Sequence, residues 1–143
     1  VLSHLRLADH AIASDLIPLG TADMILSMEP LESLRYLDYL SPDAAVVTAT
    51  DPFVNIPDYP PREELLARLG RLPRAVPVEA ERLAREAGDP LTRNTVMVGA
   101  AAHLLPLRRE SFEGAIRQTF GAKGERAVAV NAAAFEAGWR ASA

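Results

Sequence analysis

Residues 24–35 constrain the fold of this chain more than any other stretch. An apolar run from Met24 to Met28 ends in Glu29-Pro30, and an amphipathic segment led by acidic residues follows at once. Proline suits the first position of a helix, and an acid in the first turn faces the positive end of the helix dipole. The pattern predicts a buried strand that runs straight into a helix. In open α/β sheets, ligands bind at the edge where such corners lie.

The rest of the chain alternates between strand and helix patterns. Further strands are predicted at 44–50 and 74–78, and an N-terminal hairpin is predicted from 1–8 and 11–17. Helices are predicted at 30–40, 62–72, 79–87, 94–105, 109–120 and 125–140. Strands 22–28 and 44–50 should be parallel neighbours, because a helix connects them. We therefore predict one α/β domain over residues 1–143, with three layers, a mostly parallel central sheet and a helical C-terminal tail.

Composition narrows the function classes. The chain of 143 residues is 49% hydrophobic, which is typical of a globular domain, and it carries a net charge of −4. A negative net charge argues against nucleic acid as a main partner, since phosphate binding needs a basic surface. Cysteine is absent, so the chain holds no disulfide, no thiolate-bound zinc and no iron–sulfur cluster. No apolar run reaches the roughly 18–20 residues that span a bilayer.

The first residues suggest a processed product or a fragment. The chain begins with valine inside a strand pattern, and charged residues interrupt its first 13 positions, which argues against a signal peptide. We expect a cytoplasmic protein, because a reducing compartment is compatible with the cysteine-free composition.

Glu29 is the most noticeable isolated carboxylate. It ends an apolar strand, where desolvation would raise its pKa and a nearby cation would lower it. The alternative is an acid that only stabilises the start of the helix. Glu32 and Arg35 are three residues apart on the same helix and predict a solvated ion pair. No nucleophile motif and no catalytic residue is predicted, and the histidines at 4, 10 and 103 are too scattered for a metal site.

Two other polar patterns are candidates for contacts. If Ser3-His4-Leu5-Arg6 forms a strand, His4 and Arg6 share one face and Ser3 takes the other. This face would bind an anion or a partner's carboxylate, or it would be the solvated side of a hairpin. Asn131 interrupts an apolar helix face, and Asn94 lies near the start of its own helix. Buried amides need hydrogen bonds, so both are predicted to tie structural elements together.

Five of these segments, in order, resemble the gamma-type domain of 2-oxoacid:ferredoxin oxidoreductases. They are Ser3-His4-Leu5-Arg6, Pro18-Leu19-Gly20-Thr21-Ala22-Asp23, Glu29-Pro30-Leu31-Glu32-Ser33-Leu34-Arg35, Asn94-Thr95-Val96-Met97-Val98-Gly99-Ala100 and Asn131-Ala132-Ala133-Ala134-Phe135-Glu136-Ala137-Gly138. Each motif alone is weak, but five in sequence cover essentially the whole chain. Within the family, the chain is most similar to the small (beta) subunits of indolepyruvate ferredoxin oxidoreductases.

The resemblance implies that the chemistry belongs to a partner. A large subunit is expected to carry thiamine diphosphate and iron–sulfur clusters, with ferredoxin as the electron acceptor. The implied reaction is oxidative decarboxylation of an aryl 2-oxoacid, such as indolepyruvate, with coenzyme A to an acyl-CoA. The isolated chain is expected to be inactive and to bind no cofactor. Ser3, His4, Arg6, Glu29 and Arg35 are candidates for docking or for a coenzyme A path.

One departure from the family pattern leaves alternatives open. Family members begin with a glycine-rich strand–helix unit and an Arg-Gly-Gly segment, and neither is in this chain. We expect that the domain lacks its N-terminal glycine-rich βα unit here. Pyruvate, 2-oxoglutarate or a branched-chain 2-oxoacid remain alternative substrates. A non-catalytic assembly module and a stand-alone nucleotide-binding protein remain alternative functions.

Overall fold

The computed structural model describes all residues from 1 to 143. Three strands form one sheet in the order β1-β2-β3, with β1 at Ala22–Ser27, β2 at Leu40–Ala49 and β3 at Ala75–Val78. Both pairings are parallel. The predicted parallel sheet and the predicted neighbours are therefore confirmed.

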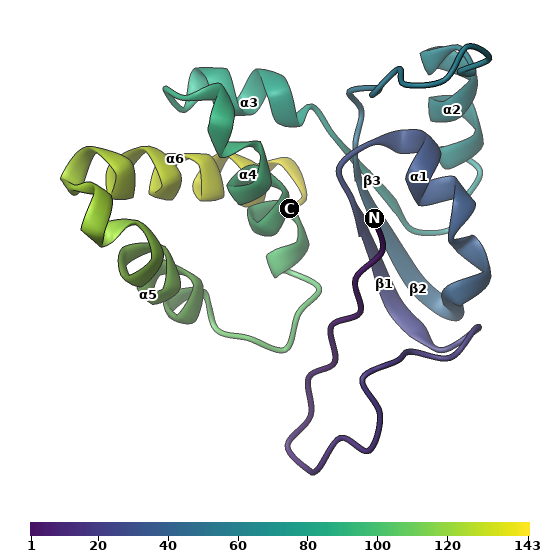
Figure 1. The fold of residues 1–143 in the computed structure, drawn as a ribbon, viewed down its shortest axis with the longest axis horizontal. Coiled ribbons are helices and arrows are strands. Elements are labelled where there is room, and N and C mark those ends of the chain that lie inside the picture. Colours follow the sequence, from purple (N-terminus) through teal and green to yellow (C-terminus); the bar gives the residue numbers. More distant parts are fainter.

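Helices cover both faces of the sheet and make three layers (Figure 1). Helices α1 (Pro30–Arg35) and α2 (Arg62–Leu69) lie on one face, and α3 (Ala80–Glu86) and α4 (Arg93–Ala102) lie toward the other. The C-terminal helices α5 (Arg109–Phe120) and α6 (Glu125–Ala141) pack outside α4. Short 3₁₀ turns lie at Leu37–Tyr39, Pro90–Thr92 and Gly121–Lys123. None of the helices combines the length and the apolar character that crossing a membrane requires.

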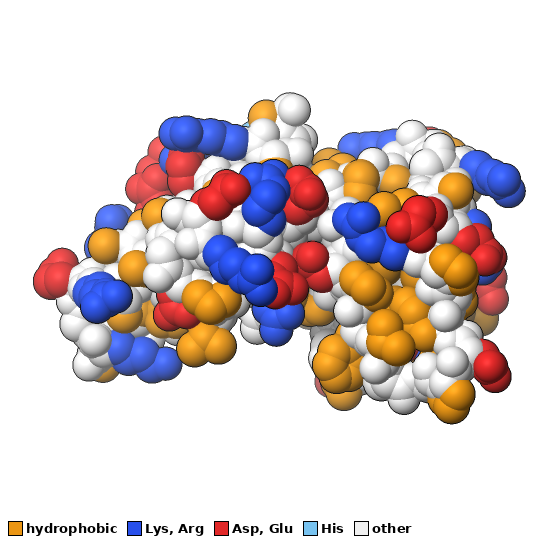
Figure 2. Space-filling model, turned by 90° about the horizontal axis from the view of Figure 1, so that it is seen from above, with side chains coloured by type: hydrophobic (Ala, Val, Ile, Leu, Met, Phe, Trp, Pro, Cys, Tyr) orange, Lys and Arg blue, Asp and Glu red, His pale blue; other side chains and the backbone are white.

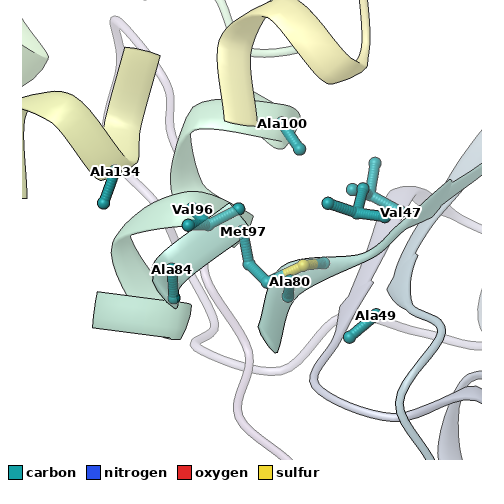
Figure 3. Close-up of a cluster of buried hydrophobic side chains, with 9 residues drawn as sticks. Val47, Ala49, Ala80, Ala84, Val96, Met97, Ala100 and Ala134 are labelled. Atoms are coloured by element: carbon teal, nitrogen blue, oxygen red, sulfur yellow. The ribbon is translucent and has the colours of Figure 1, made fainter. Parts of the chain in front are cut away.

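The main core lies between the sheet and the α3–α4–α6 layer (Figure 3). Val47 and Ala49 of β2 meet Met97 and Ala100 of α4, and Ala134 of α6 closes the far side. Alternate residues of β2 point to the opposite face, where Leu65 and Leu69 of α2 are buried. The second half of β2, from Ala45 to Ala49, is therefore buried on both faces, which explains why this part of the strand is mostly apolar.

Helices α4 and α6 cross with their backbones almost in contact. A Cβ atom on Gly99 would overlap the carbonyl oxygen of Phe135, and one on Gly138 would overlap that of Val96. Only glycine fits at these two positions, and the buried alanines beside Gly99 extend the close approach.

The predicted N-terminal hairpin is wrong. Residues 1–21 contain no strand, although the chain does double back on itself (Figure 1). Arg6 Nη1 donates to the carbonyl oxygen of Ser14 at 2.6 Å, and the amide of Ile17 donates to His4 Nδ1 at 2.8 Å. Side-chain hydrogen bonds thus join the two limbs, while Leu5 and Leu16 remain exposed. A two-stranded ladder alone is marginal in water.

The helix predicted over 30–40 is shorter than expected. α1 ends at Arg35, and Leu40 already belongs to β2, where it pairs with Ala22. Ser41 and Pro42, which follow the predicted helix, lie inside β2. Proline cannot donate to the ladder, and the register slips here, from Ala22 opposite Leu40 to Met24 opposite Ala45.

Asn131 is buried and hydrogen-bonded to backbone, as predicted. Its Nδ2 donates to the carbonyl oxygen of Ala127 at 2.9 Å, and its Oδ1 accepts from the Thr95 hydroxyl at 2.6 Å. The second bond links α6 to α4. Asn94, in contrast, is exposed on the rim of a small groove between α4 and α5, so the prediction of a buried amide is wrong for that residue.

Asn131→Leu should lower the free energy of unfolding by about 1–3 kcal/mol, because both bonds are lost and the Thr95 hydroxyl keeps no partner. Asn94→Leu is the matched control and should change it by less than about 0.5 kcal/mol, since Asn94 is exposed. Urea denaturation of the two variants measures both. Equal stability of the two variants would show that Asn131 does not tie the helices together.

Candidate functional site: the carboxyl edge of the sheet

The corner between β1 and α1 is held by the side chain of Glu29. Its two carboxylate oxygens accept hydrogen bonds from the amides of Leu31 and Glu32, at 2.9 and 2.8 Å. The Ser27 hydroxyl donates to the Glu29 carbonyl oxygen at 2.7 Å and fixes the preceding turn. Glu29 therefore stabilises the start of α1. This is the alternative that the sequence left open, an acid at the start of a helix.

Tyr59 makes a third contact with Glu29. Its hydroxyl donates to Oε2 at 2.6 Å, across 30 residues of sequence. Burial and the hydrogen bond to this carboxylate raise the pKa of the Tyr59 hydroxyl well above its ordinary value, because ionisation would place two negative charges side by side. Sequence reasoning missed Tyr59, which lies between prolines in a loop with no periodic pattern.

The loop 51–61 is fixed over the carboxyl edge at both ends as well as by Tyr59. Asp51 Oδ2 accepts from the amide of Glu81 at 3.0 Å, and Arg62 Nε donates to the carbonyl oxygen of Thr50 at 3.0 Å. Between these anchors the loop presents Phe53 and Val54, each 69% exposed. A loop with four prolines and three anchors is largely preorganised, so these apolar side chains are displayed in a defined place.

Hydrophobic side chains gather on this face of the molecule. Figure 2 shows a hydrophobic patch on the half that holds the sheet, with charged side chains around it. Met28, Phe53, Val54 and Ile56 are all exposed large hydrophobic residues close to the strand ends. Contiguous apolar patches rimmed by polar groups mark interaction sites.

A cavity lies along the free edge of β1. It encloses about 490 Å³ between β1, α1 and the first residues of the chain. Of the predicted site residues, Ser3, His4 and Glu29 line it, whereas Arg6 and Arg35 do not. Arg35 is exposed and forms the predicted ion pair with Glu32, with 2.9 Å between Nη1 and Oε1. The structure thus brings the Ser3–His4 segment and the Glu29 corner to one sheet edge.

No catalytic arrangement accompanies this edge. His4 uses Nδ1 to accept from the Ile17 amide, and its ring lies edge-on against Tyr39. His103 lies at the end of α4, where it packs against the ring of Trp139. No group of three or more His, Asp or Glu side chains is placed to hold a metal ion.

Comparison with known proteins places the chain among oxidoreductase subunits. It is 34% identical to indolepyruvate oxidoreductase subunit IorB of Pyrococcus horikoshii, over 99% of this chain and 73% of the relative. Subunit IorB of Archaeoglobus fulgidus is 33% identical over 84% of this chain and 63% of the relative. That of Methanothermobacter thermautotrophicus is 35% identical over 92% and 70%. The chain thus spans between 63% and 73% of the length of these relatives.

A solved structure supports the fold. The 2-oxoglutarate:ferredoxin oxidoreductase of Magnetococcus marinus, solved with 2-oxoglutarate, coenzyme A and succinyl-CoA bound, matches 87% of this chain and 20% of its own chain. The TM-score is 0.64 at 22% sequence identity. A family model described as pyruvate ferredoxin/flavodoxin oxidoreductase matches residues 1–141. The chain therefore belongs to the pyruvate ferredoxin/flavodoxin oxidoreductase family, and its curated relatives are IorB subunits of indolepyruvate oxidoreductases.

Proposed function

We propose that this chain is the cluster-free subunit of a 2-oxoacid:ferredoxin oxidoreductase that decarboxylates an aryl pyruvate, foremost indolepyruvate, to its acyl-CoA. The observation that carries the proposal is the match to subunit IorB relatives over as much as 99% of the chain. Thiamine diphosphate and the iron–sulfur clusters are assigned to a large partner subunit. For the clusters, the assignment is supported by the absence of cysteine ligands from these 143 residues. Ferredoxin accepts the electrons of the complex.

The molecule's surface is consistent with a subunit. The anchored loop 51–61 presents apolar side chains at the carboxyl edge of the sheet. Exposed Phe53 and Val54 do not stabilise an isolated chain, whereas exposed apolar patches are typical of interaction sites. Preorganised apolar anchors lower the entropic cost of association. We assign this face to contact with the large subunit.

The assay that tests the proposal compares substrates in the reconstituted complex of the two subunits. Indolepyruvate should support faster ferredoxin reduction than pyruvate, 2-oxoglutarate or a branched-chain 2-oxoacid. A preference for one of these alternatives would refute the aryl pyruvate assignment but leave the family intact.

The N-terminal segment and the Glu29 corner are proposed to contribute to docking or to a coenzyme A path. Ser3 and His4 share the cavity with Glu29, while Arg6 and Arg35 lie exposed nearby in sequence. The double variant His4→Ala with Arg6→Ala removes the contacts to Ile17 and Ser14 and releases the two limbs of this segment.

In the assembled complex, this double variant should weaken subunit association or raise the coenzyme A concentration at half-maximal rate, by about threefold or more. Gel filtration and steady-state kinetics measure the two effects side by side. Values equal to those of the wild type in both measurements would show that the segment has no role in function.

A further inference from the structure

One side chain holds the middle of the loop 51–61, which runs from the carboxyl end of β2 to the start of α2 (Figure 1). Residues 52–58 are exposed, and residues 52–60 make no backbone–backbone hydrogen bond. Asp51 and Arg62 fix only the ends of the loop. Between them, the Tyr59 hydroxyl makes the one side-chain hydrogen bond, to Glu29 at 2.6 Å. The course of the loop therefore depends on this bond and on its stiff prolines.

The surroundings of this hydroxyl connect the loop to the corner between β1 and α1. Oε2 of Glu29 accepts from the Leu31 amide as well as from Tyr59. Burial and Glu29 raise the pKa of the Tyr59 hydroxyl, whereas the backbone amides of Leu31 and Phe53 lower it. The start of α1, the Glu29 carboxylate and the backbone of Phe53 thus meet around one hydroxyl group.

Phe53 and Val54 have no packing of their own that would hold their direction. Each is 69% exposed, so the backbone of the loop alone decides where the two side chains point. A freely moving loop would lose its conformational freedom on binding, at a cost of about 1–2 kcal/mol for each residue that becomes fixed. A hydrogen bond to a carboxylate is charge-assisted and stronger than one between neutral groups. The bond of Tyr59 is therefore well suited to fix the loop before a partner arrives.

We propose that Tyr59 is a positioning residue for subunit association: its hydrogen bond to Glu29 holds the loop 51–61 in the course that presents Phe53 and Val54 to the large subunit. The inference rests on the proposed function, which assigns this face to the large subunit. Anchors that are already in place lose less freedom on association, so the bond tightens binding although Tyr59 itself needs no contact with the partner.

Limited proteolysis of the purified subunit tests the first step. Tyr59→Phe removes only the hydroxyl and leaves both amide bonds of Glu29 in place. Chymotrypsin cleaves after Phe53 but not after residue 59, because Pro60 follows. Cleavage after Phe53 should be at least about fivefold faster in the variant, since the loop opens locally once the bond is lost. Cleavage after Leu91, which is 86% exposed in a different turn, is the control and should be unchanged. Equal cleavage after Phe53 would overturn the proposal.

A double-mutant cycle with the immobilised large subunit tests the second step. Tyr59→Phe should raise the dissociation constant of the two subunits by about fivefold, because the anchors are no longer held in place. Phe53→Ala with Val54→Ala should raise it by at least about tenfold. Tyr59→Phe added to this pair should raise it by less than about twofold further, since no anchor remains to be positioned.

The cycle separates the failure of this inference from that of the proposed function. If Tyr59→Phe weakens binding equally with and without the two anchors, the hydroxyl acts by another route and the positioning role is wrong. It is also wrong if the variant speeds cleavage without weakening binding, while loss of the anchors does weaken it. If loss of Phe53 and Val54 leaves binding unchanged, the assignment of this face to the large subunit fails, and the role of Tyr59 fails with it.

Discussion

Gly138→Ala should cost at least about 3 kcal/mol of folding free energy and prevent the domain from accumulating as folded protein. The added methyl group would overlap the carbonyl oxygen of Val96, and the clash is with backbone rather than with a side chain that rotates away. Relief requires that α4 and α6 move apart, which opens the core around Met97 and Ala134. A change of this size takes a large share of a domain's marginal stability.

Gly114→Ala is the matched control for this prediction. Gly114 lies inside α5, and outside the backbone of its own helix no atom comes within 4 Å of the position that a Cβ would take. Alanine is the better helix former by about 1 kcal/mol, so this variant should be as stable as the wild type or more stable. Circular dichroism during urea unfolding compares the two. If Gly138→Ala unfolds at the wild-type urea concentration, the description of the α4–α6 crossing is wrong.

Phe135→Ala should destabilise the domain by about 3–5 kcal/mol, the range for removing a fully buried aromatic side chain. Phe135 is 1% exposed and forms the centre of a second core with Ala102 and Ile116. Its ring stacks on that of Phe112, with the ring centroids 5.5 Å apart. The cavity left behind borders the crossing of α4 and α6, where the backbones leave little room for collapse.

Phe53→Ala provides the comparison at an exposed site. Phe53 is 69% exposed, so its removal should change the free energy of unfolding by less than about 0.5 kcal/mol. Thermal unfolding of both variants measures the difference. A loss at Phe53 that matches the loss at Phe135 would mean that the loop 51–61 packs against the domain and is not a displayed surface.

The elements that could be predicted from the sequence are those with a strong period and a clear start. The strand at 22–28 and its Glu29-Pro30 corner combine an apolar run with a proline at the first helical position, and both were placed correctly. The long C-terminal helix α6 also has a strong helical period in its sequence, and it was predicted at nearly the observed bounds. The two family motifs that contain Gly99 and Gly138 meet at the crossing of α4 and α6. Both glycines are therefore explained by the close packing of these two helices.

The errors arise where tertiary contacts decide between local preferences. The N-terminal segment has strand-like alternation, yet nothing in the structure pairs with it, and Arg6 and His4 bind backbone instead. The helix after Pro30 ends early because pairing with Ala22 draws Leu40 into β2. In both cases a tertiary contact overrides the local preference, and a local sequence pattern does not show such contacts.

The candidate site was only partly predictable for a related reason. Glu29 stands out in the sequence because it ends an apolar run, but its partner Tyr59 is 30 residues away in an irregular loop. The same limit applies to Asn94 and Asn131, which look alike in their motifs. Only the packing of α4 against α6 makes Asn131 buried and leaves Asn94 exposed.

The most direct test of the central claim is a reconstitution with omission of each subunit. The large subunit, this subunit, and both together are assayed for reduction of ferredoxin or methyl viologen with indolepyruvate and coenzyme A. The account predicts no reduction by this chain alone and activity that depends on adding it to the large subunit. Reduction by this chain alone, or full activity of the large subunit without it, would contradict the assignment as a cluster-free subunit of the enzyme.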